Sequence, residues 1–328
     1  MRRREFITLI GGATTTWPLA ARAQQAATPV VALVTGRSPE ASSSVAGTFR
    51  KGLSEAGYVE ARNVTVEYHF LDGRYELLPS LMADLVRRGV AVIATPGSTP
   101  ASMAAKAATA TIPIVFGVSA DPVKLGLVTN VARPDGNATG VNFFLGDIIA
   151  KRLELLHGLI PKAVRIAVLV NPTNASTAQA ARRDIPQAAH TMGLQIEFLN
   201  ASNSREIEVA FDTLVRDRTD ALFVTPDGFF TSRRGQLATA AARYGVPSVH
   251  ATREEVEAGG LMSYGTDLTE MQRQVGVYTG QILKGAKPAD LPVLQSTKFE
   301  FVINLQTARL FGIEVPNSVQ LLADEVIE

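Results

Sequence analysis

Residues 92–99 read VIATPGST, an apolar run that ends in several small polar residues. Residues 222–229 read LFVTPDGF and place a second Thr-Pro pair after a similar run. Thr95 and Thr225 are 130 positions apart. An apolar strand followed by a small polar loop is typical of parallel sheets that are covered on both faces. Its recurrence therefore predicts two copies of one structural unit.

The same alternation of strand and helix surrounds both copies. Strands are expected over 29–35, 63–70, 90–95 and 112–118, and again over 164–171, 194–200, 220–226 and 246–252. The helices expected between them cover 45–58, 77–89 and 99–109, and then 176–193, 207–217 and 233–245. This alternation indicates parallel sheets with right-handed crossovers, so the predicted fold class is α/β with two similar lobes.

The last part of the chain, from residue 261, is too short for a third domain. It contains one more expected strand, 261–267, a helix, 268–285, and a mixed segment, 297–312. We expect it to return and complete both lobes, so that several segments cross between them. Two lobes joined in this way enclose a cleft that closes by hinge motion.

The first 23 residues have the order of a secretory signal. Three arginines are followed by the apolar segment FITLIGGATTTWPLA and by ARA at 21–23, a small-x-small cleavage pattern. The motif RREFI at 3–7 is similar to a twin-arginine signal. The alternative is a chance basic start to a cytoplasmic protein. We expect cleavage of residues 1–23 and a periplasmic mature chain that begins at Gln24.

Composition excludes several classes of function. The 328 residues carry 32 basic and 31 acidic side chains, so no broad electrostatic field for nucleic acid or anionic membranes is expected. The absence of cysteine excludes disulfides, thiolate catalysis and thiolate metal sites. The length remaining after the leader favours two domains over one.

Small polar residues follow five of the expected strands. In open parallel α/β sheets, ligands bind beyond the carboxyl ends of the strands, so these loops are the predicted binding site. The candidate ligand-binding residues are Gly36, Arg37, Ser38, Thr95, Gly97, Ser98, Thr99, Ser119, Asp121, Asn142, Phe143, Asn171, Thr173, Asn174, Asp227 and Phe229. Several of the loops begin helices, whose free N–H groups attract carboxylates and phosphates. The alternative is that these side chains only cap their helices.

Three kinds of contact are expected in this site. Arg37 is a candidate partner for a ligand carboxylate, although a solvated surface arginine is the alternative. Asp227 and Asp121 are candidates for a ligand ammonium group, and Asp121 is also suited to cap a helix that starts at Pro122. The pairs at 143–144 and 229–230 are candidates to enclose an apolar ligand body, and the alternative is that they are partly core residues.

Signals for catalysis are poor. The four histidines lie at 69, 157, 190 and 250 without metal-binding spacing, and no nucleophile elbow, P-loop or dinucleotide fingerprint occurs. This pattern favours a binding protein with no catalytic residue, metal or cofactor. Two alternatives stay open: a two-lobed α/β enzyme such as a racemase or hydrolase, and a ligand sensor that uses the same cleft.

Three long stretches carry a resemblance to a known family. They are PIVFGVSADPVKLGLV…ARPDGNATGV at 113–141, LMSYGTDLTEMQRQVGVYTGQILKGAKPADLPV at 261–293 and TKFEFVINLQTARLFGIEVP at 297–316. They resemble the ABC-transporter substrate-binding protein family that includes tryptophan- and tyrosine-binding proteins.

The resemblance implies a type I periplasmic-binding-protein fold, with two Rossmann-like lobes and three crossings. It also implies that a small amino-acid-like or aromatic carboxylate is captured in the cleft and delivered to an ABC permease in the inner membrane. Tyr264 joins the candidate ligand residues on this basis. Lobe 1 is expected to contain 24–142 and about 262–292, and lobe 2 to contain 143–261 and about 293–328. A monomer without nucleic-acid partners is expected.

Overall fold

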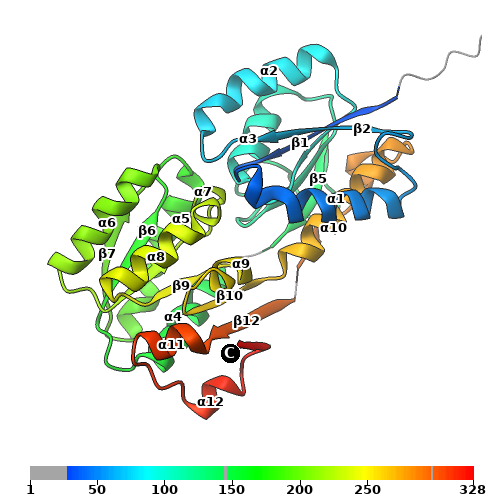
Figure 1. The fold of residues 1–328 in the computed structure, drawn as a ribbon. Helices are drawn as coiled ribbons and strands as arrows, with labels where there is room; N and C mark the ends of the chain where they lie inside the picture. The colour runs from blue at the N-terminus through cyan, green and yellow to red at the C-terminus, as the bar shows by residue number, and fades with distance from the viewer. Residues whose placement is uncertain (1–27, 144–145, 297) are drawn as a thin grey trace, which may run out of the picture.

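The computed structural model describes residues 28–143, 146–296 and 298–328. The predicted leader and Phe144 lie outside these residues. The described chain forms two α/β lobes, each built on its own sheet (Figure 1). Both sheets are mainly parallel, as the alternation of strand and helix predicts.

The first sheet has six strands in the order β11-β5-β4-β3-β1-β2. Its strands are β1 Val30–Thr35, β2 Thr65–Phe70, β3 Val92–Thr95, β4 Ile114–Val118, β5 Ala138–Asn142 and β11 Leu294–Gln295. All of its pairings are parallel.

The second sheet has seven strands in the order β13-β12-β10-β9-β8-β6-β7. Its strands are β6 Arg165–Val170, β7 Gln195–Asn200, β8 Ala221–Val224, β9 Ser248–His250, β10 Met262–Thr266, β12 Phe299–Asn304 and β13 Glu325–Ile327. From β7 to β10 this order repeats that of β2 to β5, so β3 and β8, the strands of the two Thr-Pro motifs, are equivalent. Only β12 runs antiparallel to its neighbour β10.

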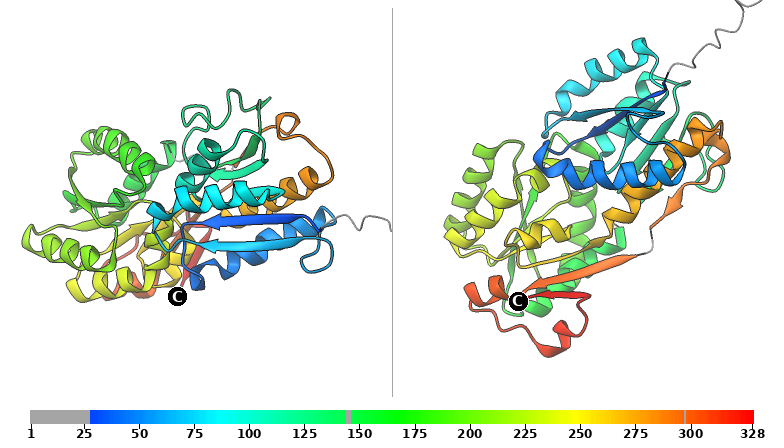
Figure 2. Two further views of the ribbon diagram at one scale, coloured as in Figure 1. Left: turned by 90° about the horizontal axis from the view of Figure 1, so that it is seen from above. Right: turned by 45° about the vertical axis from the view of Figure 1, so that its right-hand side comes forward.

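Helices cover both faces of each sheet (Figure 2). The first sheet carries α1 Ser43–Glu55 and α10 Leu268–Leu283 on one face, and α2 Leu78–Arg88 and α3 Thr99–Ala108 on the other. The second sheet carries α4 Gly146–Leu159, α5 Ala175–Thr191, α11 Leu305–Leu310 and α12 Asn317–Gln320 on one face. Its other face carries α6 Ser204–Arg216, α7 Gly228–Ser232 and α8 Arg234–Tyr244, while α9 Arg253–Glu257 contacts β10 and β12.

Strand side chains alternate between the two cores of a lobe. In β1, Val31 and Leu33 pack with α1 and α10, whereas Ala32 and Val34 pack with α2 and α3. Because both faces are covered, every one of these positions must be apolar, which explains the continuous apolar run in the sequence.

Helix α10 joins the first lobe through a close helix–helix contact. A Cβ at Gly52 of α1 would lie 1.9 Å from the carbonyl oxygen of Arg273, and one at Gly276 of α10 would lie 2.2 Å from that of Phe49. Glycine at both positions therefore allows the two backbones to touch. This contact fixes a segment from late in the sequence onto the N-terminal lobe (Figure 1).

The chain passes between the sheets three times: between β5 and α4, between β10 and α10, and between β11 and β12. The crossings differ from the expected boundaries by a few residues. Strand β10 belongs to the second sheet, although residues from 262 were expected in lobe 1, and β11 belongs to the first, although residues from 293 were expected in lobe 2. The reason is that pairing with β9 or β5 decides membership, and the strand pattern alone does not specify the neighbour.

Two further features complete the fold. The segment after Asp121, expected to start a helix, forms turns in which the Asp121 carboxylate accepts hydrogen bonds from the N–H groups of Val123 and Lys124. Within the described ranges, no helix combines the length and apolarity needed to cross a membrane.

Candidate ligand-binding cleft

The two Thr-Pro motifs end β3 and β8 at the facing edges of the lobes. Their threonine side chains are buried and bonded within their own lobes, Thr95 to the Ser102 hydroxyl at 2.8 Å and Thr225 to the Leu169 carbonyl at 2.8 Å. Ser98 accepts a hydrogen bond from the Ala101 N–H and caps α3, as the sequence suggested. The threonines thus fix the strand ends, and the residues after each proline face the cleft.

Four sets of direct contacts hold the lobes together on one side of the cleft. The Arg37 guanidinium lies 2.7 Å from a Glu254 carboxylate oxygen, and the backbone N–H of Ser38 donates to the Ser232 hydroxyl at 2.8 Å. Arg233 donates two hydrogen bonds of 3.0 Å to Asp72. The Tyr75 hydroxyl donates to Asp227 at 3.2 Å. These contacts describe a closed arrangement of the lobes.

The two backbones also touch at a pair of glycines. A Cβ at Gly228, the first residue of α7, would lie 2.7 Å from the carbonyl carbon of Gly36 in the opposite lobe. Such a distance is sterically excluded, so glycine at 228 permits this degree of closure.

Asp227 is the centre of this contact region. Its carboxylate accepts hydrogen bonds from the amide groups of Asn171 and Asn174, from the Phe229 N–H and from the Tyr75 hydroxyl. Burial raises the pKa of Asp227, and the four donors oppose that rise. Burial and the neighbouring Asp227 raise the pKa of Tyr75, so its hydroxyl remains a donor. Four acceptor sites of the carboxylate are thus occupied within the protein.

The cleft beside Asp227 is narrow, with a volume of about 50 Å³. Of the predicted residues, it is lined by Arg37, Gly97, Ser98, Thr99, Ser119, Phe143, Asn174 and Asp227. Residues that the sequence analysis missed here include Tyr75, Thr177, Met271 and Gln272. Their position could have indicated that they line the cleft, because each lies on a loop or helix next to a strand end or a crossing.

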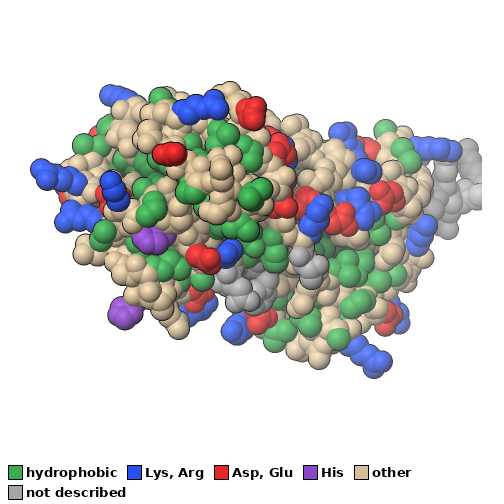
Figure 3. Space-filling view, turned by 90° about the horizontal axis from the view of Figure 1, so that it is seen from below, with side chains coloured by type: hydrophobic (Ala, Val, Ile, Leu, Met, Phe, Trp, Pro, Cys, Tyr) green, Lys and Arg blue, Asp and Glu red, His purple; other side chains and the backbone are tan. Residues whose placement is uncertain are grey.

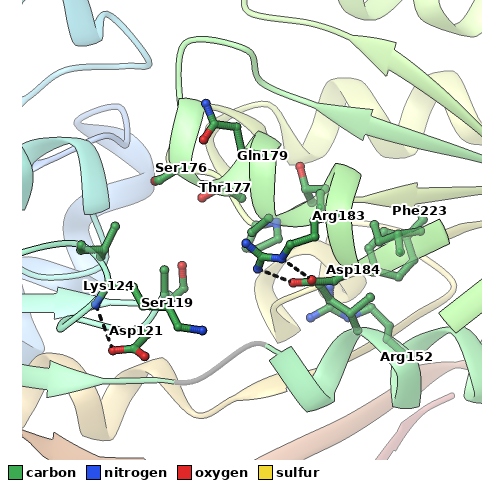
Figure 4. Close-up of a pocket in the computed structure, with 18 residues that line it drawn as sticks. Ser119, Asp121, Lys124, Arg152, Ser176, Thr177, Gln179, Arg183, Asp184 and Phe223 are labelled. Carbon is green, nitrogen blue, oxygen red and sulfur yellow. Dashed lines mark hydrogen bonds and ion pairs between the residues drawn. The ribbon is translucent and has the colours of Figure 1, made fainter. Parts of the chain in front are cut away.

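A larger space, which we name the side cavity, adjoins the cleft at Ser119, Thr177 and Pro226. It has a volume of about 290 Å³ and lies between the 119–125 loop of the first lobe and α4, α5 and β8 of the second. Figure 4 shows Ser119, Asp121 and Lys124 on one side, and Thr177, Gln179 and Arg183 on the other. This volume is close to the lower end of the range for small-molecule sites, about 300–1,000 Å³.

The other predicted residues do not line the cleft or the side cavity. Contacts between the lobes involve Gly36 and Ser38, Thr95 fixes the end of β3, and Asn171 donates to Asp227. Thr173 is exposed and donates hydrogen bonds to Asn171. The Asn142 amide donates to the carbonyls of Val118 and Ala120.

Two predicted aromatic residues belong to cores. Phe229 is 2% exposed and packs with Phe230 in the core beneath α6 and α8. Tyr264 lies on β10 and packs against Phe299 and Phe301. Neither side chain lines the cleft in this closed form.

Arg152 of α4 is a fully buried cation in the wall of the side cavity. Its Nε donates to the Tyr264 carbonyl at 2.9 Å, and its guanidinium carbon lies 5.2 Å from the centre of the Phe223 ring. Burial lowers the pKa of Arg152 to about 10, against the opposing effect of the Glu255 charge, so it remains cationic at neutral pH. Sequence reasoning missed it, although Ile149, Leu153 and Leu156 place position 152 on the apolar face of a helix.

Lysine, arginine and acidic side chains are interspersed on the face shown in Figure 3. In the described part of the chain, no group of three or more histidine and acidic side chains is placed to hold a metal ion.

Two α/β lobes that close on a cleft through three crossings define a periplasmic-binding-protein fold. The model of the ABC transporter substrate-binding protein family matches residues 29–327, and the chain belongs to this family. It is therefore a binding protein of an extracytoplasmic transport family and not an enzyme.

Known relatives agree with this assignment. A tyrosine-binding protein of Clostridioides difficile is 27% identical over 266 residues, which are 81% of this chain and 76% of that protein. A crystal structure of an ABC domain from Streptococcus pneumoniae in complex with L-Trp has a TM-score of 0.81 and 26% identity, covering 92% of this chain and 100% of that one. A conserved domain protein from Vibrio cholerae has a TM-score of 0.82 and 26% identity, covering 91% and 99%.

Proposed function

We propose that this protein captures a small amino-acid-like or aromatic carboxylate between its lobes and delivers it to an ABC permease of the inner membrane. The observation that carries the proposal is the pair of adjoining spaces, cleft and side cavity, lined by both lobes and bounded by direct contacts between them. A ligand held by both lobes favours closure, because it shifts the equilibrium by its differential affinity for the closed form.

The cleft end of this site suits a carboxylate. Gly97, Ser98 and Thr99 line it at the start of α3, where backbone N–H groups and the helix dipole favour negative charge. The side-cavity end suits an apolar body, because Leu125, Ile185 and Phe223 are among its lining residues. The relatives that bind tyrosine and tryptophan support the same ligand class.

The same proposal covers location and partners. The twin-arginine-like leader, with cleavage after residue 23, supports a periplasmic mature protein. We expect this mature chain to be a monomer that meets its permease in the closed form. Cell fractionation and N-terminal sequencing test the location, and light scattering of the purified chain tests the monomer.

A thermal-unfolding screen of the purified mature chain tests the ligand class. The panel contains L-tyrosine, L-tryptophan, L-phenylalanine and benzoate, with glucose and ribose as a chemically distinct control class. A specific ligand at about 100 times its Kd adds about 2.7 kcal/mol to the free energy of unfolding, which raises Tm by several degrees. Stabilisation by a sugar, with no response to any carboxylate, would contradict the proposal.

A further inference from the structure

The wall of the side cavity contains a buried charge, Arg152, whose two terminal amino groups make no hydrogen bond to the described residues. The Nη1 and Nη2 groups of Arg152 have no hydrogen-bond partner among the described residues, and the side chain is 0% exposed. Only its Nε group is bonded, to the Tyr264 carbonyl. Burial of a guanidinium with two unbonded amino groups is unfavourable by several kcal/mol, and the Glu255 charge offsets only part of that cost.

The neighbouring acidic side chains are engaged elsewhere. Glu255 is the acid whose charge acts on Arg152, but its oxygens accept hydrogen bonds from the Thr231 hydroxyl and from the backbone N–H groups of Ala251 and Thr252. Asp184, which also lines the side cavity, is held by two hydrogen bonds from Arg183. Neither carboxylate therefore satisfies the Nη groups of Arg152.

The surroundings of Arg152 suit one end of an apolar ligand. Ile149, Ile185 and Phe223 lie in the same cavity wall, and the guanidinium lies near the Phe223 ring (Figure 4). An aromatic ring placed in this cavity has apolar neighbours and lies beside Arg152. A planar guanidinium binds a carboxylate through two parallel hydrogen bonds.

We propose that Arg152 is a specificity-determining residue that receives a second carboxylate, at the far end of the ligand from the one bound beside α3. The preferred ligand is then a compound with an aromatic or apolar body and an acidic group at each end. This inference rests on the proposed function and narrows its ligand class from aromatic carboxylates to dicarboxylates.

Calorimetric titration with matched probes tests the inference on the wild-type protein. The pairs are L-phenylalanine with 4-carboxy-L-phenylalanine, and benzoate with terephthalate. Within each pair the second carboxylate is the only addition. We expect the dicarboxylate to bind about 10- to 100-fold more tightly, as for other hydrogen bonds to charged groups.

Variants locate the effect. Arg152→Gln should abolish the preference for the dicarboxylate while the monocarboxylate still binds, and Arg152→Lys should restore part of it because the charge is kept. Arg183→Gln is the matched control, because Arg183 lines the same cavity but is paired with Asp184 and largely exposed. We expect it to keep the preference. If Arg152→Gln does not fold, the wild-type comparison and Arg152→Lys still test whether Arg152 causes the preference for the dicarboxylate.

The outcomes separate this inference from the proposed function. If the monocarboxylate of a pair binds as tightly as its dicarboxylate, the role of Arg152 is refuted and the proposed function stands. An unchanged preference in Arg152→Gln also refutes it. If no probe of either pair binds, and the thermal screen finds no carboxylate, both proposals fail.

Discussion

Tyr75 of the first lobe donates a hydrogen bond to Asp227 of the second, with 3.2 Å between Oη and Oδ2, although 152 positions separate them in the sequence. Both side chains are buried and both line the cleft. This bond joins the lobes at the site itself. Closure of the protein and the geometry of the cleft are therefore coupled through one carboxylate.

Replacing Tyr75 with Phe removes this bond and leaves the ring in place. One hydrogen bond contributes about 1 kcal/mol, so the closed form should become less populated and the apparent ligand affinity should fall about fivefold. Small-angle X-ray scattering of the ligand-free variant should show a larger radius of gyration. Tyr58→Phe is the matched control, because the Tyr58 hydroxyl donates to the Leu283 carbonyl inside the first lobe. Equal behaviour of the two variants would count against a role in closure.

Gly228→Ala should block closure by sterics alone. Its Cβ would meet the carbonyl carbon of Gly36 at 2.7 Å, and that atom is backbone and cannot turn aside. We expect at least a tenfold loss of ligand affinity by calorimetry, which corresponds to about 1.4 kcal/mol or more. The ligand-free protein should lose only the direct contacts between the lobes, because neither lobe is altered internally.

The matched control for this substitution is Gly235→Ala in α8, where a new Cβ meets nothing within 4 Å. Alanine is favoured over glycine inside a helix by about 0.5–1 kcal/mol, so this variant should be slightly more stable and should bind normally. Normal binding by Gly228→Ala would show that the ligand-bound form is more open than the structure described above.

Asp227→Ala should weaken ligand binding and also lower the stability of the protein. Asp227 was a candidate for a ligand ammonium group, but its four acceptor sites are occupied by internal donors that would lose their acceptor. Binding should weaken because the bond from Tyr75, which joins the lobes, is lost. We expect the free energy of unfolding to fall by about 3 kcal/mol, measured by denaturant titration. Asp212→Ala, which removes an exposed acceptor of the Tyr244 hydroxyl, should cost about 0.5 kcal/mol or less. An Asp227 variant with wild-type affinity would remove this residue from the site.

The architecture was predictable because short stretches of sequence specify each strand and helix of the α/β pattern. Strands such as β1 need apolar residues on both faces, and helices such as α2 and α8 end at glycines in the left-handed conformation, Gly89 and Gly245. Strand β5 escaped notice because its sequence, ATGVN, is short and partly polar, and its burial comes from the strands beside it. The membership of β10 and β11 likewise depends on pairing partners that no local pattern specifies.

For the candidate site, the sequence indicated which loops meet between the lobes, but not what their side chains do. The loops after the strands do reach the cleft, as Ser98, Ser119 and Asp227 show. The roles of their side chains depend on partners from the opposite lobe, as with Arg37 and Glu254, and these are set by the closing geometry. The buried environment of Arg152 also arises only when α4, β8 and β10 are assembled.

Lowering the pH below about 6.5 should destabilise the protein before its carboxylates titrate. Burial lowers the pKa of His250 below its ordinary value, with Arg152 acting in the same direction and Glu255 opposing it. His250 therefore binds a proton near pH 6.5 in the unfolded chain, but only at lower pH in the folded chain. The free energy of unfolding that is present above pH 6.5 is lost as the pH falls from 6.5 toward the folded pKa. Partial burial also lowers the pKa of His69, so His69 affects stability in the same direction as His250. We expect a loss of about 1 kcal/mol between pH 6.5 and 5.5 from a fully buried histidine, measured by denaturant titration at each pH.

The His250→Gln variant separates this contribution from the others. It removes the titrating ring, so its free energy of unfolding should fall less between pH 6.5 and 5.5 than that of the wild type. His190→Gln is the control, because His190 is exposed on α5 and should leave the wild-type slope unchanged. Glu67, Glu206 and Glu270, whose pKa values are lowered chiefly by hydrogen bonds, lose their stabilising effect only below about pH 4.5, outside this window. If the free energy of unfolding falls equally with pH in the wild type and in His250→Gln, protonation of His250 does not destabilise the fold. The nearby Glu255 carboxylate would then stabilise the charged ring.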